Sequence, residues 1–117
     1  MSLLNSKSTH QLGEPTVARP DPALVIEGDP EFRTWSCLED KAYAGIWQAT
    51  PGKHKVSRDG KTLEQFYILE GEIELHEEGA EHPQKFGVGD LVVIRPNFRG
   101  TWRTISTVKK VYFTISA

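Results

Sequence analysis

Glu64 is the residue of this sequence whose type and setting most suggest chemistry. It lies in an apolar segment and has the same parity as Phe66 and Ile68. A carboxylate among such side chains has a raised pKa unless it is paired, and it could then act as a general acid or base. The alternative is a salt bridge, for which Arg58, across the turn at 59–60, is a candidate partner.

Arginine and tryptophan side chains are the candidates for ligand binding. Four arginines lie near the segments that carry the apolar strands: Arg58, Arg95, Arg99 and Arg103. A guanidinium binds two oxygens of a carboxylate or phosphate at once, so one or two of them could hold an acidic metabolite; the alternative is ordinary surface charge. Trp47 and Trp102 either fill the core or form a flat wall for a small organic ligand. Arg103 faces outward if Trp102 faces inward, because neighbouring strand residues point to opposite faces.

Histidine and lysine positions are less suggestive. His10, His76 and His82 are predicted to lie in a tail, on a solvent face and in a turn, whereas His54 shares the parity of Arg58 and could face the interior. None has the spacing of metal ligands, so the sequence predicts no metal and no cofactor, with a divalent metal as the alternative. The Lys109-Lys110 pair is expected to be solvated, or at most to place Lys110 inside beside Tyr112.

Composition is that of an ordinary globular protein. The chain has 117 residues, 38% of them hydrophobic and 26% charged, with a net charge of -2, which suits one domain. This balance excludes the basic surface of a nucleic-acid-binding protein, and no apolar run reaches the ~20 residues of a membrane span. The single Cys37 cannot form an internal disulfide and no secretory signal is visible, so we expect a cytoplasmic protein.

The elements that must position these groups are short strands. About eight or nine apolar segments are separated by turn residues, and none keeps a helical period, which predicts an all-β sandwich or barrel. Asp59-Gly60 is a hairpin signal, and Gly71 is predicted to separate two strands. Residues 1–22 are predicted to be an N-terminal tail or dimer arm, and residues 23–117 a single domain.

Several segments resemble the motifs of the cupin superfamily. Residues 64–72, Glu-Gln-Phe-Tyr-Ile-Leu-Glu-Gly-Glu, resemble the second half of the first cupin motif. Gly52 resembles the glycine that opens this motif. Residues 89–96, Gly-Asp-Leu-Val-Val-Ile-Arg-Pro, resemble the start of the second motif. Residues 100–102 with 107–112 are similar to small single-domain cupins related to ureidoglycine aminohydrolase. The resemblance implies an RmlC-like fold, a small antiparallel double-sheet jelly-roll barrel with Glu64 pointing inside.

The same resemblance implies a metal site whose ligands are missing here. Metal-binding cupins have two histidines just before the motif-one glutamate and a third after the proline of motif two. Residues 57–60, before Glu64, contain no histidine, and the third position falls at Gly100 or Thr101. Only Glu64 remains of the family's ligand set, which implies a barrel without the family's metal chemistry.

Three functions remain open on this basis. The first is metal-free binding of a small polar or acidic metabolite. The second is an enzyme of the ureidoglycine aminohydrolase-like type, acting on a small ureide or carboxylic acid with Glu64 as the acid or base. The third is a structural or partner-binding barrel with a filled interior. The predicted ligand-binding residues are Trp47, His54, Arg58, Phe66, Trp102 and Tyr112. We expect a homodimer, because open sheet edges need covering.

Overall fold

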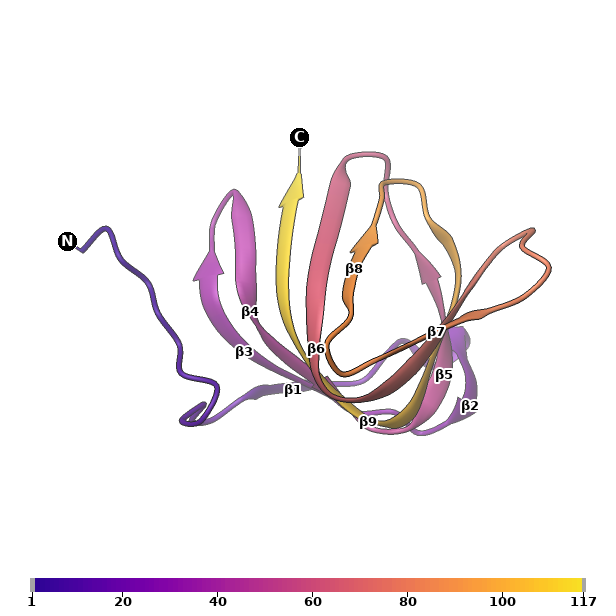
Figure 1. Cartoon of the computed structure of the whole chain (residues 1–117), viewed down its shortest axis with the longest axis horizontal. Coiled ribbons are helices and arrows are strands. Elements are labelled where there is room, and N and C mark those ends of the chain that lie inside the picture. The colour runs from indigo at the N-terminus through magenta and orange to yellow at the C-terminus, as the bar shows by residue number, and fades with distance from the viewer. Residues whose placement is uncertain (1, 117) are drawn as a thin grey trace.

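Nine β-strands and one short 3-10 helix form the fold of residues 2–116, which the computed structural model of the chain describes (Figure 1). The elements are β1 (Thr16–Ala18), the 3-10 helix (Pro22–Leu24), β2 (Val25–Gly28), β3 (Phe32–Glu39), β4 (Ala42–Ala49), β5 (Gly52–Ser57), β6 (Thr62–Glu77), β7 (Gln84–Gly87), β8 (Leu91–Ile94) and β9 (Arg99–Ser116). All strand pairs are antiparallel. The predicted all-β fold is confirmed. No helix in residues 2–116 has the length and apolar character needed to cross a membrane.

The two long strands, β6 and β9, pass through both layers of the barrel. In the first sheet, the first half of β6 and the second half of β9 pair with each other, with β8 and β4 on their outer sides and β3 and β1 beyond β4. In the second sheet, the other halves pair with each other, with β7 beside β6, β5 beside β9 and β2 beyond β5. This is the double-sheet jelly-roll topology.

Gly71 does not end a strand, contrary to the prediction from sequence. The predicted segments on either side of it form the single strand β6, and two predicted C-terminal segments likewise form β9. The register of β6 against β9 shifts between Ile68 and Ile73, where β6 leaves one sheet for the other. Gly71 has φ +85°, and a Cβ there would overlap the carbonyl oxygen of Thr107. The glycine therefore allows a sharp bend in a continuous strand, as glycines at bulges do.

Alternation along β6 and β9 separates the core from the outer surface. Glu64, Phe66 and Ile68 are buried, whereas Gln65 and Tyr67 between them are exposed. The apolar core consists of buried side chains from both sheets, namely Ala49, Phe66, Ile68, Ile73, Leu75, Val92, Ile94, Trp102 and Val108. Because Glu64 and Lys110 have the parity of this core, two charged groups are buried with it.

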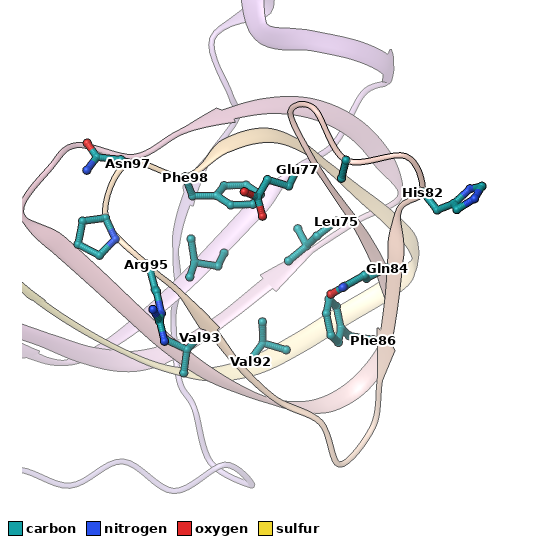
Figure 2. A pocket seen from close by; sticks show the side chains of 13 residues that line it. Leu75, Glu77, His82, Gln84, Phe86, Val92, Val93, Arg95, Asn97 and Phe98 are labelled. Carbon is teal, nitrogen blue, oxygen red and sulfur yellow. The ribbon is translucent and has the colours of Figure 1, made fainter.

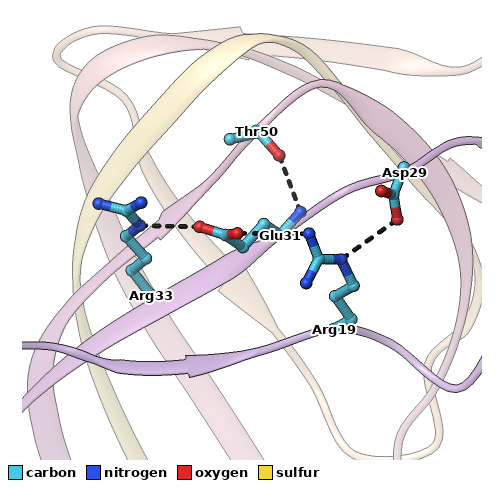
Figure 3. A network of polar contacts seen from close by, with 5 residues as sticks. All are labelled: Arg19, Asp29, Glu31, Arg33 and Thr50. Carbon is cyan, nitrogen blue, oxygen red and sulfur yellow. Dashed lines mark hydrogen bonds and ion pairs between the residues drawn. The ribbon is translucent and has the colours of Figure 1, made fainter.

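A polar network fixes the chain between β1 and β2 (Figure 3). Arg19 lies 3.2 Å from a carboxylate oxygen of Asp29 and 3.4 Å from one of Glu31, and Arg33 lies 2.9 Å from the other oxygen of Glu31. The backbone NH of Glu31 donates to the Thr50 hydroxyl at 2.8 Å. Exposed pairs of this kind contribute little each, but together they hold the segment that follows Arg19. That segment borders the cavity described below.

Part of the predicted N-terminal tail is paired with the barrel. Within residues 1–22, Thr16–Ala18 forms β1 and pairs with the start of β3. Asp21 caps the 3-10 helix by accepting a hydrogen bond from the Ala23 NH at 2.9 Å. The role of residues 1–22 as a dimer arm stays a prediction.

Candidate functional site

A cluster of three charged side chains, two buried and one partly exposed, lies at one end of the barrel. Glu64 comes from β6, Lys110 from β9, and Arg58 from the residue after β5. The two carboxylate oxygens of Glu64 are divided between the cations: Oε2 lies 2.7 Å from Lys110 Nζ and Oε1 lies 2.8 Å from Arg58 Nη2. One carboxylate with two cations leaves one uncompensated positive charge in the cluster.

Three aromatic rings surround the Lys110 ammonium. Its Nζ lies 4.5 Å from the ring centre of Trp47, 4.3 Å from that of Phe66 and 4.7 Å from that of Trp102. The negative faces of aromatic rings attract a cation at these distances. The Trp102 indole NH is itself satisfied, since it donates to the Thr104 hydroxyl at 3.0 Å. The aromatic side chains therefore stabilise a buried positive charge while forming the wall of the barrel.

The neighbouring positive charges lower the pKa of Glu64, whereas an unpaired carboxylate in the same place was expected to have a raised pKa. Burial would raise its pKa, but Lys110 and Arg58 hold the pKa of Glu64 below its ordinary value. Burial lowers the pKa of Lys110, with Glu64 acting against that shift. The salt-bridge alternative with Arg58 is confirmed by the geometry. An ionised Glu64 can accept a proton but is not a general acid at neutral pH.

His54, on β5, is a neutral aromatic group beside the cluster. Its ring centre is 5.2 Å from Phe32 and 6.4 Å from Trp102, and its Nδ1 is buried without a hydrogen-bond partner. Burial, reinforced by the positive charges of Arg58 and Lys110, lowers the pKa of His54 from 6.5 to about 4. The imidazole is therefore uncharged at neutral pH and can donate or accept one hydrogen bond at Nδ1.

This shift predicts a pH window in which His54 weakens the fold. Between pH 6.5 and about 4, the unfolded chain binds a proton at His54 that the folded chain does not, so stability falls as the pH falls through this range. The free energy of unfolding, measured in urea across this range, is expected to fall more steeply in the wild type than in His54→Gln. The exposed His82→Gln is the matched control and is expected to follow the wild type. Parallel profiles for wild type and His54→Gln would contradict the assignment.

The cluster borders an open cavity of about 470 Å³. The predicted residues that line it are Trp47, His54, Arg58, Glu64, Trp102 and Tyr112, joined by Lys110. Phe66 does not line the cavity and lies behind the Lys110 ammonium. Pro20 and Leu24, which follow the polar network of Figure 3, close one side of it. Arg58 Nε and His54 Nδ1, both buried and without partners, belong to residues of this lining.

Lys110 is the residue of this candidate site that the sequence did not single out. The possibility that it lies inside beside Tyr112 was open, but the neighbouring lysine and the apolar residues on the opposite face gave no reason to prefer it. Val111 and Phe113 are exposed although they are apolar, while Lys110 is 4% exposed. At this point of β9 the apolar side chains therefore face outward and the charged side chain faces inward, which is the reverse of the usual alternation. By contrast, Arg103 faces outward as predicted, with Nη1 2.8 Å from Glu27.

The donor set at this site does not suit a divalent metal. Residues 2–116 contain no group of three or more histidine, cysteine, aspartate or glutamate side chains placed to hold one. Both oxygens of Glu64 are already engaged by cations, and a metal ion beside Lys110 and Arg58 would add to an uncompensated positive charge. Transition metals require several nitrogen or oxygen donors that are free to coordinate.

A second cavity, of about 520 Å³, opens in another part of the barrel (Figure 2). Its lining is apolar inside and polar at the rim, with Leu75, Phe86, Val92 and Phe98 inside and Glu77, Gln84 and Arg95 around them. His82 points away from it. Of the residues considered from sequence as ligand-binding candidates, Arg95 lines this cavity, whereas Glu64, Trp47, His54, Arg58, Phe66, Trp102 and Tyr112 do not. None of the buried unpartnered polar atoms found in residues 2–116 belongs to its lining. The first cavity is therefore the better candidate for specific recognition.

Comparison with known proteins agrees with this fold. The model of the family described as EutQ-like cupin domain matches residues 38–112. A crystal structure of a protein of unknown function from Pseudomonas syringae pv. tomato, of the DUF861 family, is similar at a TM-score of 0.76 and 27% identity, covering 89% of this chain and 45% of that one. No curated protein matches the chain.

Two further solved structures share the fold at lower identity. The EutQ protein of Clostridium difficile has a TM-score of 0.63 at 14% identity, covering 75% of this chain and 64% of that one. Ectoine synthase from P. lautus has a TM-score of 0.68 at 15% identity, covering 95% of this chain and 77% of that one. At these identities the similarity shows the fold alone. The chain spans less than two thirds of the Pseudomonas protein and of the Clostridium EutQ protein.

Proposed function

Because the chain belongs to the EutQ-like cupin domain family, we propose that its barrel binds a small anionic metabolite, a carboxylic acid, without a metal ion. The observation that carries the proposal is the uncompensated positive charge of the Glu64, Lys110 and Arg58 cluster at the wall of an open cavity. Lys110 is buried and paired with Glu64, whereas Arg58 is partly exposed at the cavity, and a partly desolvated guanidinium is stabilised when a counter-charge approaches it. A ligand carboxylate supplies that counter-charge.

Arg58 is the group best placed to receive the ligand. Its Nη2 contacts Glu64, while its Nε is buried without a partner and its side chain is 31% exposed. A guanidinium can bridge two carboxylates, because its donors form a planar fork with more than one edge. The neutral His54 offers a second hydrogen-bonding atom at Nδ1. The ligand is expected to place its carboxylate at Arg58 and a small polar group at His54.

The remaining walls favour a small, partly flat molecule. The ring centre of Trp47 lies 5.0 Å from that of Phe32 and 5.4 Å from that of Trp102. Tyr112 lines the same cavity. A volume of about 470 Å³ lies within the range of small-molecule sites. An open cavity of this size argues against the alternative of a filled, purely structural barrel.

Turnover is the second candidate function. The motifs around Trp102 and Tyr112 resemble ureidoglycine aminohydrolase-like cupins, and an ionised Glu64 at the cavity wall could accept a proton from a bound ureide or carboxylic acid. Its oxygens are held by Lys110 and Arg58, which makes it a weak base. A compound that binds and is converted by the wild type but only bound by Glu64→Gln would favour the enzyme. Binding without conversion in both would favour a binding protein. We place either activity in the cytoplasm, where the single, unpaired Cys37 would stay reduced.

An arginine substitution tests the binding proposal. A panel of small carboxylic acids and their uncharged amides is screened by thermal shift, and the best acid is titrated by calorimetry. Arg58→Gln is expected to weaken acid binding about 10–100-fold, the loss of a charged hydrogen bond. Arg103→Gln is the matched control, because Arg103 also pairs with a glutamate but on the outer surface, and it is expected to bind like the wild type.

Two results would overturn the binding proposal. One is that the amides bind as tightly as the acids, and the other is that Arg58→Gln binds as tightly as the control. The metal-free state has a separate test, in which the protein is dialysed against manganese, zinc and nickel and its metal content is measured by mass spectrometry. A stoichiometric metal would contradict it.

A further inference from the structure

The second cavity lies where the two sheets of the barrel are not joined by a strand (Figure 2). β8 is an edge of the first sheet and β7 an edge of the second, and within residues 2–116 each of them pairs with β6 alone. The cavity is lined by side chains of β6, β7 and β8 and of the turns that follow β6 and β8. Because no strand of residues 2–116 closes this side, part of the barrel interior reaches solvent between the two edges.

The floor of the second cavity is apolar. Leu75, Val92 and Ile94 belong to the buried core, and Phe86 and Phe98 are half-buried against it. The two phenylalanines come from different borders of the cavity, one from β7 and the other from the turn between β8 and β9. Apolar surface of this kind is stabilised when an apolar group of a ligand displaces water from it.

Two side chains of opposite charge lie at the rim of this floor. Glu77 ends β6, Arg95 follows β8, and both are exposed and line the cavity (Figure 2). Within residues 2–116 neither forms an ion pair, with the other or with any third residue. Arg95 was a candidate from sequence for binding an acidic group, and it does not line the first cavity. The rim therefore offers one positive and one negative group to a ligand.

We propose that the second cavity binds a zwitterion with an apolar body, in chemical class an α-amino acid with a large apolar side chain. Its carboxylate is expected at Arg95, its ammonium at Glu77, and its side chain on the floor beside Phe86 and Phe98. The two rim charges favour this class, because a simple acid would meet Glu77 as a like charge and a simple amine would meet Arg95 as one. The volume of about 520 Å³ lies within the range of small-molecule sites.

This site is separate from the first cavity in its residues and in its charge. No residue lines both cavities. The first has one carboxylate facing two cations, which suits an anion, whereas the second has one charge of each sign at its rim. The barrel would thus hold two ligands of different classes, and each site can be tested without the other.

Three probes of similar shape test the proposal on the full chain. They are L-phenylalanine, 3-phenylpropanoate, which lacks the amino group, and 2-phenylethylamine, which lacks the carboxylate. Calorimetry measures the affinities, and backbone amide shifts in NMR spectra locate the bound probe. L-phenylalanine is expected to shift the amides around Phe86 and Phe98. It is expected to bind there about tenfold more tightly than either of the other two, since each of them loses one charged hydrogen bond.

Substitutions at the rim test the two charges with little risk to the fold, since both side chains are exposed. Arg95→Gln and Glu77→Gln are each expected to weaken L-phenylalanine binding about 5–20-fold. Glu77→Gln is also expected to strengthen binding of 3-phenylpropanoate in this cavity, because it removes a like charge. Arg99→Gln and Glu78→Gln are the matched controls. Both side chains are exposed and lie outside the lining, and both variants are expected to bind like the wild type.

Arg58→Gln distinguishes this proposal from the binding of acids in the first cavity. It is expected to leave L-phenylalanine binding unchanged, and a loss of binding would place the probe in the first cavity and overturn the proposal. The absence of L-phenylalanine binding at millimolar concentration would also overturn it, as would equal affinities for L-phenylalanine and 3-phenylpropanoate. So would an affinity that neither Arg95→Gln nor Glu77→Gln changes.

Discussion

Lys110→Met is expected to lower the free energy of unfolding by about 3 kcal/mol, because it removes one partner of a buried ion pair and leaves the other buried. Glu64 is 5% exposed and would keep only Arg58 as a counter-charge. Arg58 places the effect at the lower end of the range for broken buried pairs, about 3–5 kcal/mol. The measurement is urea unfolding at neutral pH, followed by tryptophan fluorescence and circular dichroism.

The double variant separates the lost charge from the lost packing. Glu64→Gln with Lys110→Met removes the stranded carboxylate charge while keeping side chains of similar volume, and the Arg58 guanidinium, which loses its partner, is partly exposed to water. It is expected to recover much of the stability, since buried ion pairs replaced by neutral groups of similar shape are often neutral in effect. If Lys110→Met cost less than about 1 kcal/mol, or if the double variant were as unstable as the single one, the pair would not be the buried charge cluster described above.

Gly71→Ala is expected to cost about 3–4 kcal/mol, a loss at the upper end for a single methyl group. Two penalties combine at this position: φ of +85° is unfavourable for alanine, and the new Cβ would overlap the Thr107 carbonyl and lie 2.7 Å from Val108 Cα. Both atoms are backbone and cannot move aside without distorting β9. The measurement is again urea unfolding.

Gly79→Ala is the matched control for this prediction. Gly79 has a similar φ of +87° but has no atom within 4 Å of the position a Cβ would take. It is expected to cost only the backbone penalty, about 1 kcal/mol. Equal losses at both positions would show that the close contact between β6 and β9 at Gly71 has no energetic weight.

The fold could be predicted from sequence because its signals are local. Turn residues, short apolar segments and the Asp59-Gly60 hairpin define an all-β chain, and the cupin-like motifs place the strands in order. The continuity of β6 and β9 could not be predicted. A positive φ at Gly71 is equally compatible with a turn and with a bend in a continuous strand, and only the pairing with β9 distinguishes the two.

The site was harder to predict because its decisive contact joins distant residues. The motif pointed to Glu64, and parity pointed to His54 and Arg58, all of which line the first cavity. The contact of Lys110 with Glu64 was not predicted because the two residues are 46 positions apart in the sequence and because the neighbours of Lys110 on β9 are apolar. These apolar neighbours are exposed because they lie on the outer face of the first sheet. The sequence pattern of a strand does not show which of its two faces is the outer one.

The position of β9 also dictates when the barrel can form during synthesis. Within residues 2–116, β4 pairs with β3 and β9, and β5 pairs with β2 and β9, so β9 alone joins them to β6. Before Arg99–Ser116 emerges, the chain is three separate sets of strands with exposed apolar faces. A nascent chain of this protein therefore cannot close the barrel until β9 inserts between sets of strands that were synthesised before it.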